Sequence, residues 1–172
     1  MNLQSDDFEL FGLARRFAQD RALIDARWKE LQRQAHPDKF SAQGAAAQRV
    51  AMQWSVRINE AYQRLKVPLK RAAYLCELGG APVNAENNTA MPGSFLMQQM
   101  QWREDLDDAH DAGDFEKIRL QVKQTERDSL QKLERCIDQD GNFADAVAQV
   151  RALMFIERFA RDLDSRLDAI ES

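Results

Sequence analysis

The sequence contains few of the residues that interrupt helices or that build covalent and metal frameworks. Its 172 residues include only 7 Gly, 4 Pro, 2 Cys and 2 His. Cys76 and Cys136 are far apart in the chain, which argues against a disulfide framework and against a cysteine metal site. We therefore expect no metal and no cofactor.

Long apolar runs and targeting signals are absent as well. No stretch approaches the roughly 18 consecutive apolar residues that a membrane-spanning helix needs. The N-terminal sequence MNLQSDDFELFGL lacks the basic start, the apolar run and the cleavage site of a signal peptide. The net charge of -4 argues against nonspecific nucleic-acid binding. We expect a cytoplasmic protein with neither nucleic acid nor a membrane as partner.

The motifs of common catalytic sites are also missing. The sequence has no glycine-rich phosphate loop, no HExxH, no GxSxG and no CxxC. Its carboxylates are numerous, but a chain with 30% charged residues usually carries them on solvated helix faces. We predict that the protein is not an enzyme. A small helical hydrolase or isomerase that uses His36 and Asp38 stays as an alternative.

Apolar residues with helical spacing recur along almost the whole chain, and no segment alternates like a half-buried strand. The pattern predicts an all-α fold. Gly and Pro gather in LGGAPVNAENNTAMPG, a polar segment between two helical regions. We place a linker at 79–93 there, between an N-terminal domain at 1–78 and a C-terminal domain at 94–172.

The N-terminal domain is predicted to be an antiparallel helical hairpin with short bracing helices. A turn over residues 8–11 precedes a helix that opens at Asp20, a suitable N-cap, and ends near His36, because Pro37 disfavours helical geometry in the residue before it. The loop HPDKFSAQG leads to a second helix over 45–66, and Pro68 starts a short helix to Leu78. The inward faces are predicted to carry Ile24, Trp28, Leu31 and Ala35, then Val50, Trp54, Ile58, Ala61 and Leu65.

The C-terminal domain is predicted to be a three-helix bundle with helices over 94–112, 114–138 and 142–170. Gly113 and Gly141 separate these helices, and Asp114 and Asn142 are the predicted N-caps. Short connections make neighbouring helices antiparallel. The predicted core contains Phe95, Trp102, Leu106 and Ala109, then Phe115, Ile118, Val122 and Leu133, then Leu153, Ile156, Ala160, Leu163, Leu167 and Ile170.

The tripeptide His36-Pro37-Asp38 lies between the two long helices of the N-terminal domain. One interpretation is simply a helix stop followed by a loop turn. However, a helical wheel places Lys29 and Arg33 opposite the apolar face, so a basic surface leads up to this loop. A rigid, exposed loop beside a basic face is suited to recognise an acidic protein surface.

The first helix of the C-terminal domain has a second apolar face. Leu96, Met97 and Met100 lie about 100 to 200 degrees around from its core residues, and Glu104 shares their face. Neighbouring helices could bury this face, or it could be an exposed patch that binds a protein. Phe155 lies about 120 degrees off the seam of the last helix, so we expect it to be exposed too.

The blocks LQRQAHPDKF, DDFELFGL and INEAYQRLKVPLKRAAYL resemble a J-domain over residues 6–75. J-domains stimulate ATP hydrolysis by DnaK-type chaperones. The resemblance implies a co-chaperone and ATPase activator whose chaperone-binding residues are His36, Pro37, Asp38, Lys29 and Arg33. A general J-protein that holds unfolded clients is the alternative within this class.

Together with FLMQQMQWREDLDDA, these blocks resemble the HscB family, the J-type co-chaperones of bacterial iron–sulfur cluster assembly. That resemblance covers essentially the whole chain. It implies a C-terminal three-helix domain that binds the cluster scaffold IscU and a partner chaperone of the HscA type. It also implies scaffold-binding residues, namely Leu96, Met97, Met100, Gln101, Glu104 and Phe155. Gln101 departs from the family member compared, which carries an acidic residue there. We expect no counterpart of the cysteine-rich zinc extension that some eukaryotic relatives carry at the N-terminus.

Overall fold

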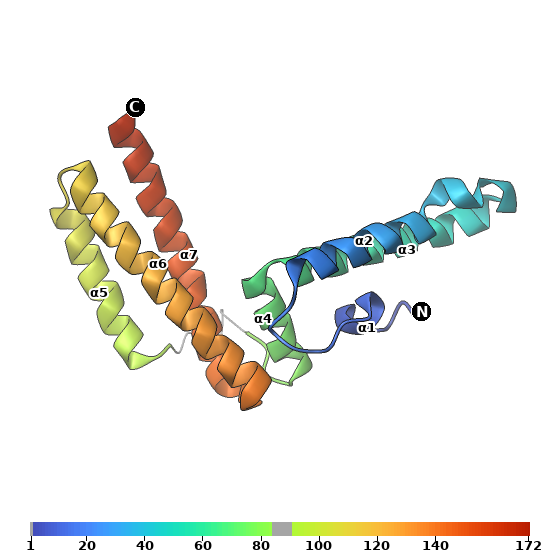
Figure 1. Ribbon diagram of the computed structural model, residues 1–172, viewed down its shortest axis with the longest axis horizontal. Helices are drawn as coiled ribbons and strands as arrows, with labels where there is room; N and C mark the ends of the chain where they lie inside the picture. Colours follow the sequence, from blue (N-terminus) through green and yellow to red (C-terminus); the bar gives the residue numbers. More distant parts are fainter. Residues whose placement is uncertain (1, 84–90) are drawn as a thin grey trace. The chain divides into compact units, whose positions relative to one another are not determined.

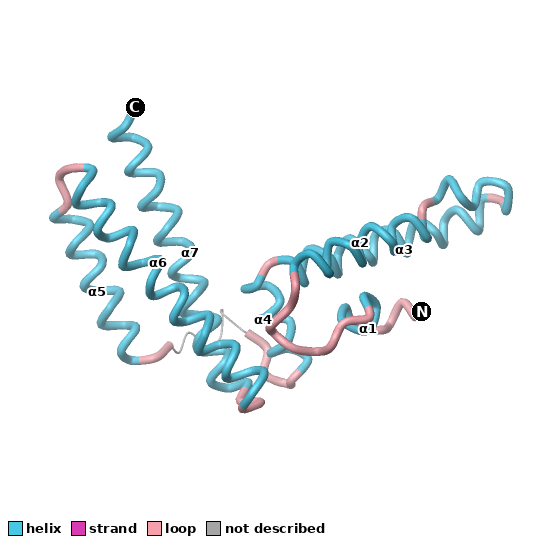
Figure 2. Tube along the Cα trace, in the orientation of Figure 1, coloured by secondary structure: helices cyan, strands magenta, loops and turns pink. Residues whose placement is uncertain are grey.

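The computed structural model describes residues 2–83 and 91–172, and these residues form helices and no strand (Figures 1 and 2). The all-α prediction is confirmed. The chain divides into two compact units, Met1–Leu75 and Cys76–Ser172. Of the linker predicted at 79–93, residues 84–90 lie outside the described residues, so the boundary given from the sequence stays a prediction.

The first unit is built on the hairpin of α2 (Arg21–Ala35) and α3 (Ala45–Lys66), which pack side by side (Figure 1). Asp20 caps α2 as predicted, because its carboxylate accepts a hydrogen bond from the backbone N–H of Ala22 at 2.9 Å. Ile24 and Ile58 are fully buried between the two helices. This packing fixes the end of α2 next to the start of α3. The His36-Pro37-Asp38 tripeptide lies between these two helix ends.

Two short helices brace the hairpin. The turn predicted over residues 8–11 is a helix, α1 (Asp7–Phe11), with a capping box between Asp6 and Glu9. Its Phe8 and Phe11 side chains are buried, and α1 packs against α2 and α3. Helix α4 (Pro68–Leu78) starts at its proline as predicted, because proline lacks only an N–H that the first turn leaves unused.

A buried carboxylate fastens α1 to the hairpin. Asp7 has no solvent exposure, and Arg64 grips it with two hydrogen bonds, of 2.6 and 2.8 Å. Arg57 donates a third, of 2.7 Å, from the same helix α3. The hydroxyl of Tyr74 on α4 accepts a hydrogen bond from the Asp7 backbone N–H at 3.0 Å. One aspartate thus connects α1, α3 and α4.

Two further expectations for the first unit were wrong. Val50 is 51% exposed, whereas the adjacent Ala51 is buried, so the inward stripe of α3 runs one position away from the predicted one at this end. Residues predicted as a loop form a 3-10 helix, η1 (Pro37–Gln43), because Pro37 fits its first position and His36 caps it.

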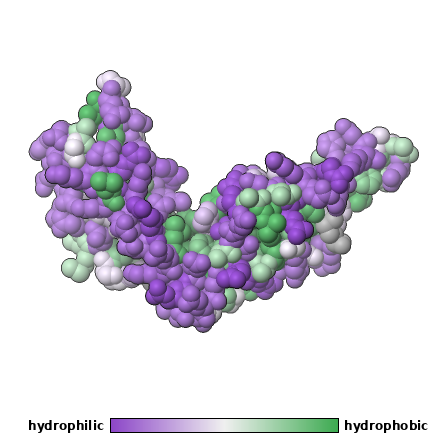
Figure 3. Space-filling model, in the orientation of Figure 1, coloured by the Kyte–Doolittle hydropathy of each residue, from purple (hydrophilic) through white to green (hydrophobic). Residues whose placement is uncertain are grey.

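The second unit contains α5 (Gly93–Asp108), α6 (Ala112–Glu134), the π-helical turn η2 (Arg135–Gln139) and α7 (Phe143–Glu171). Helices α6 and α7 pack along their length, and α5 contacts α7 through Phe95 and Trp102. Figure 3 shows that hydrophilic residues cover most of the visible face of this unit. The predicted core residues that are buried here are Phe95, Trp102, Leu106, Phe115, Ile118, Val122, Leu133, Leu153, Ile156, Leu163 and Leu167.

The helix ends of the second unit differ from the prediction. The N-cap of α6 is Asp111 and not Asp114, and α6 runs through the glycine expected to interrupt it. Asp114 instead lies in the first turn, where its carboxylate accepts a hydrogen bond from the backbone of His110 at 3.1 Å. Asn142 caps α7 as predicted. Ile170 lies in the last turn of α7 and is exposed, so the apolar seam ends at Leu167.

We predict that Asp7→Asn lowers the free energy of unfolding of the first unit by about 3 kcal/mol. The amide keeps the size of the side chain but removes the charge that both arginines need. Urea unfolding followed by the fluorescence of Trp28 and Trp54 measures this change. Asp25→Asn is the control, because Asp25 pairs with Arg21 at the surface, where such a pair contributes below about 1 kcal/mol. Equal losses in the two variants would contradict the role assigned to Asp7.

Candidate functional site

The HPD segment (His36, Pro37 and Asp38) turns the chain from α2 into η1. His36 ends α2, and its Nδ1 atom accepts a hydrogen bond from the backbone N–H of Asp38 at 3.2 Å. The backbone carbonyl of Asp38 accepts a hydrogen bond from the Ser41 hydroxyl at 3.1 Å. These local bonds fix the backbone of the segment.

The Asp38 carboxylate projects from this turn into solvent, with 91% of the side chain exposed. The His36 Nδ1 atom lies 3.6 Å from this carboxylate, but it already accepts the Asp38 N–H and so does not donate to it. A rigid turn therefore presents a carboxylate whose hydrogen-bonding capacity is almost unused. This arrangement suits a contact with a partner protein better than catalysis, which favours an enclosed pocket.

The two predicted basic residues on α2 differ in their surroundings. Lys29 and Arg33 are both exposed, but Arg33 donates to Glu30 from two nitrogen atoms, at 2.7 and 3.1 Å. The hydrogen bonds from Arg33 and then Gln34 lower the pKa of the Glu30 carboxyl to about 2. Lys29 has no carboxylate within ion-pair distance among the described residues. The positive charge of Lys29 is therefore the one more fully available to a partner.

On α5, three apolar side chains form an exposed surface, here called the α5 patch. Leu96, Met97 and Met100 are 47%, 74% and 66% exposed. The sequence left open whether neighbouring helices bury this face, and in the described residues they do not. Gln101 and Glu104 are exposed beside the patch, and the Gln101 amide donates to Asp105 at 2.9 Å. Exposed methionines next to polar residues are typical of a protein-binding surface.

Phe155 on α7 is half-buried and not simply exposed. Its ring contacts Phe95 of α5 edge to face, with ring centres 5.8 Å apart, and stacks near Phe159 at 6.0 Å. The guanidinium of Arg103 on α5 lies over the Phe155 ring, 5.9 Å from the ring centre. Phe155 therefore borders α5 and also supports the packing of α5 on α7.

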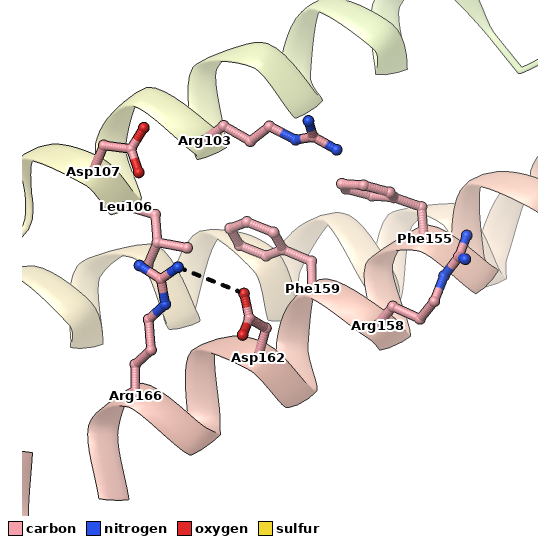
Figure 4. Close-up of a pocket in the computed structure, with 8 residues that line it drawn as sticks. All are labelled: Arg103, Leu106, Asp107, Phe155, Arg158, Phe159, Asp162 and Arg166. Carbon is pink, nitrogen blue, oxygen red and sulfur yellow. Dashed lines mark ion pairs between the residues drawn. The ribbon is translucent and has the colours of Figure 1, made fainter. Parts of the chain in front are cut away.

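A groove of about 520 Å³ lies between α5 and α7, with Phe155 in its wall (Figure 4). Two of its arginines, Arg103 and Arg158, were not selected from the sequence. Each follows a predicted scaffold-binding residue by three positions, Met100 and Phe155 respectively, which is the spacing of neighbours on a helix face. That spacing was a usable signal, but the sequence could not show that α5 and α7 bring both arginines to one groove.

The two cysteines are placed where reactive chemistry is disfavoured. Cys76 is buried, and burial raises the pKa of its thiol to about 11. Burial also raises the pKa of the half-buried Cys136 thiol. Within residues 2–83 and 91–172 there is no cluster of three or more potential metal ligands, and no helix there is long and apolar enough to cross a membrane.

Comparison with known proteins finds relatives along the whole chain. The chain is 45% identical over 174 residues to a protein named "Co-chaperone protein HscB homolog" from Burkholderia thailandensis, with 99% of each chain covered. It is 44% identical to a protein of the same name from Bordetella pertussis, with 93% of this chain and 95% of that one covered.

Solved structures and a family model agree with these relatives. The chaperone HscB from Vibrio cholerae matches with a TM-score of 0.82 and 32% identity, over 96% of this chain and 99% of that one. Human co-chaperone protein HscB matches with a TM-score of 0.87 and 25% identity, over 96% and 84%. Residues 91–164 match the family model described as the HSCB C-terminal oligomerisation domain. The chain therefore belongs to the HscB family of co-chaperones.

Proposed function

We propose that this protein binds an iron–sulfur cluster scaffold of the IscU type, delivers it to a DnaK-type chaperone of the HscA type and stimulates the ATPase of that chaperone. Such a protein aids the maturation of iron–sulfur proteins in the cytoplasm and needs no catalytic activity of its own. The observation that best supports this is the presence of two exposed recognition surfaces on two units of one chain. These are the HPD segment in the first unit and the α5 patch in the second.

Two separate surfaces allow one chain to hold both partners at once. The scaffold binds to the α5 patch while the HPD segment of the same chain binds to the chaperone. This linkage raises the effective concentration of the scaffold near the chaperone. His36, Pro37 and Asp38 provide the trigger, and Lys29 with Arg33 provides electrostatic attraction.

The size of the α5 patch bears on the alternative of a general holder of unfolded clients. Only three large apolar side chains are exposed together on α5, next to polar Gln101 and Glu104. A small apolar surface with a polar border favours one folded partner of matching shape, whereas a holder of many clients needs a broad adaptable surface. We therefore assign the patch to a single scaffold protein.

Asp38→Asn is expected to reduce stimulation of the chaperone ATPase more than tenfold. The substitution removes the exposed charge of the HPD segment but leaves its backbone hydrogen bonds, so the melting temperature should stay nearly unchanged. Steady-state ATPase assays and thermal unfolding measure the two effects. The control is Glu60→Gln, which removes an exposed carboxylate from α3. Full stimulation by the Asp38→Asn variant would refute the trigger role. A loss of stimulation accompanied by a lower melting temperature would refute it as well, because Asp38 would then be a structural residue.

The pairing of Arg33 with Glu30 predicts how charge affects docking. Changing Lys29 and Arg33 together to Glu should slow association with the chaperone about tenfold. Glu30→Gln should speed it by about twofold, because this change releases the Arg33 guanidinium and removes a negative charge. Stopped-flow association at low and high salt provides the measurement. Rates that respond neither to these substitutions nor to salt would contradict electrostatic docking.

Truncating the α5 patch should affect binding and spare folding. The triple change Leu96→Ala, Met97→Ala and Met100→Ala is expected to weaken scaffold binding by at least about 2 kcal/mol, roughly thirtyfold. Each exposed truncation should change the free energy of unfolding by no more than about 0.5 kcal/mol. Calorimetric titration with the scaffold and thermal unfolding report the two quantities.

Two further variants make this test specific. Leu120→Ala removes an equally exposed apolar side chain from α6 and should leave scaffold binding unchanged. Phe155→Ala should weaken binding and also destabilise the unit by about 1–3 kcal/mol, because its ring packs on Phe95 and Phe159. Unchanged binding by the triple variant would show that the patch is not the scaffold site.

A further inference from the structure

The groove between α5 and α7 combines aromatic and charged side chains. Figure 4 shows Phe155 and Phe159 rising from α7, with Arg103 reaching over Phe155 from α5 and Arg158 extending beside it from α7. Arg103 thus lies over the half-buried Phe155 ring, 5.9 Å from its centre, and Arg158 lines the same groove from the other helix.

These two arginines differ from the third arginine of the groove. Arg166 lies 3.9 Å from the Asp162 carboxylate, so part of its charge is offset within the groove. In the described part of the chain, no carboxylate lies within ion-pair distance of Arg103 or Arg158. Asp107 and Asp162 also line the groove, but neither lies within ion-pair distance of Arg103 or Arg158, so both guanidinium groups stay open to a carboxylate of a partner.

This arrangement has the chemistry of a carboxylate-binding site. A guanidinium that lies over an aromatic ring keeps the N–H groups along its edge free to donate. Those donors match the two oxygen atoms of a carboxylate, and arginine and aromatic residues are the ones that most often dominate binding energy at interfaces. An aromatic ring beside them can receive an apolar side chain of the same partner.

We propose that Arg103 and Arg158 form a carboxylate clamp that holds an Asp or Glu side chain of the scaffold protein, while a neighbouring apolar side chain of the scaffold packs on Phe155. This inference rests on the proposed function, because it extends the scaffold site from the α5 patch into the groove. Arg103 lies one helical turn beyond Met100 of the patch, so a single bound segment can reach both. The occupant is thus an acidic segment with an apolar residue next to the acid.

The test measures the affinity of the purified scaffold, free of cluster, by titration calorimetry at low and high salt. Arg158→Gln and Arg103→Gln should each weaken binding about tenfold and make it less dependent on salt, and Arg158→Lys should retain part of the affinity. Arg127→Gln is the matched control, because Arg127 is an exposed arginine of α6 outside the groove, and it should bind like the unmodified protein.

A charge-reversal pair identifies the contact directly. Arg158→Glu should bind weakly, and changing one acidic scaffold residue to Arg should restore its affinity while weakening binding to the unmodified protein. Equal affinities of Arg158→Gln and Arg127→Gln, with the α5 patch variants still weakened, would overturn the clamp and leave the proposed function standing. No binding by the unmodified protein would overturn both. Sedimentation of the protein alone tests whether the groove binds a second copy of this chain. If Arg158→Glu abolished self-association and left scaffold binding unchanged, the groove would belong to that second copy and the clamp would be overturned.

Discussion

The buried carboxylate of Asp7 is the contact on which the first unit depends. Burying a charge is costly unless it is paired and hydrogen-bonded, and here Arg57 and Arg64 supply three bonds to its two oxygen atoms. The same carboxylate raises the pKa of the Arg64 guanidinium. Because both arginines belong to α3, the network fixes α1 against one helix of the hairpin and limits how α3 can shift along its neighbours. The HPD segment therefore projects from a rigid support.

In the second unit, an aromatic cluster has the corresponding role. Phe95 and Trp102 of α5 meet Phe155 and Phe159 of α7, with ring centres 5.4 to 5.8 Å apart across the two helices. The cluster uses the inner face of α5 and so leaves the opposite face, with Met97, to solvent. Packing and recognition are thus separated around one helix. Phe155 is the exception, because it contributes to both.

The sequence predicted the helices and most of their buried faces because these depend on local periodicity. Asp20, Pro68 and Asn142 were found at helix starts because capping is decided by a few adjacent residues. Asp114 was a wrong choice for the same reason, since Asp111, three residues earlier, can serve equally well. Local signals could not rank these two aspartates.

Long-range contacts were the part that the sequence could not supply. Gly79 was interpreted as a helix breaker, yet a Cβ atom at this position would lie 2.6 Å from the ring of Phe143, so close packing also requires glycine there. The buried role of Asp7 was missed, because an acidic residue near a helix start is usually solvated.

In the candidate site, the residues of the HPD segment and the α5 patch follow from short stretches of sequence. The groove that unites Arg103 with Arg158 depends on two helices about fifty residues apart in the chain, as the positions of these arginines show.

The distribution of paired and unpaired charge separates structural residues from those available to partners. Arg64, Arg33 and Arg166 each face a carboxylate of their own unit, so much of their electrostatic attraction is satisfied before any partner arrives. Lys29, Arg103 and Arg158 have no carboxylate within ion-pair distance among the described residues. Only charges of the second kind gain a full new interaction on binding, because a paired charge must first give up its own partner. Since the chain as a whole is acidic, an acidic partner surface gains most where an unpaired cation lies next to a recognition surface, as Lys29 does beside the HPD segment and Arg103 beside the α5 patch.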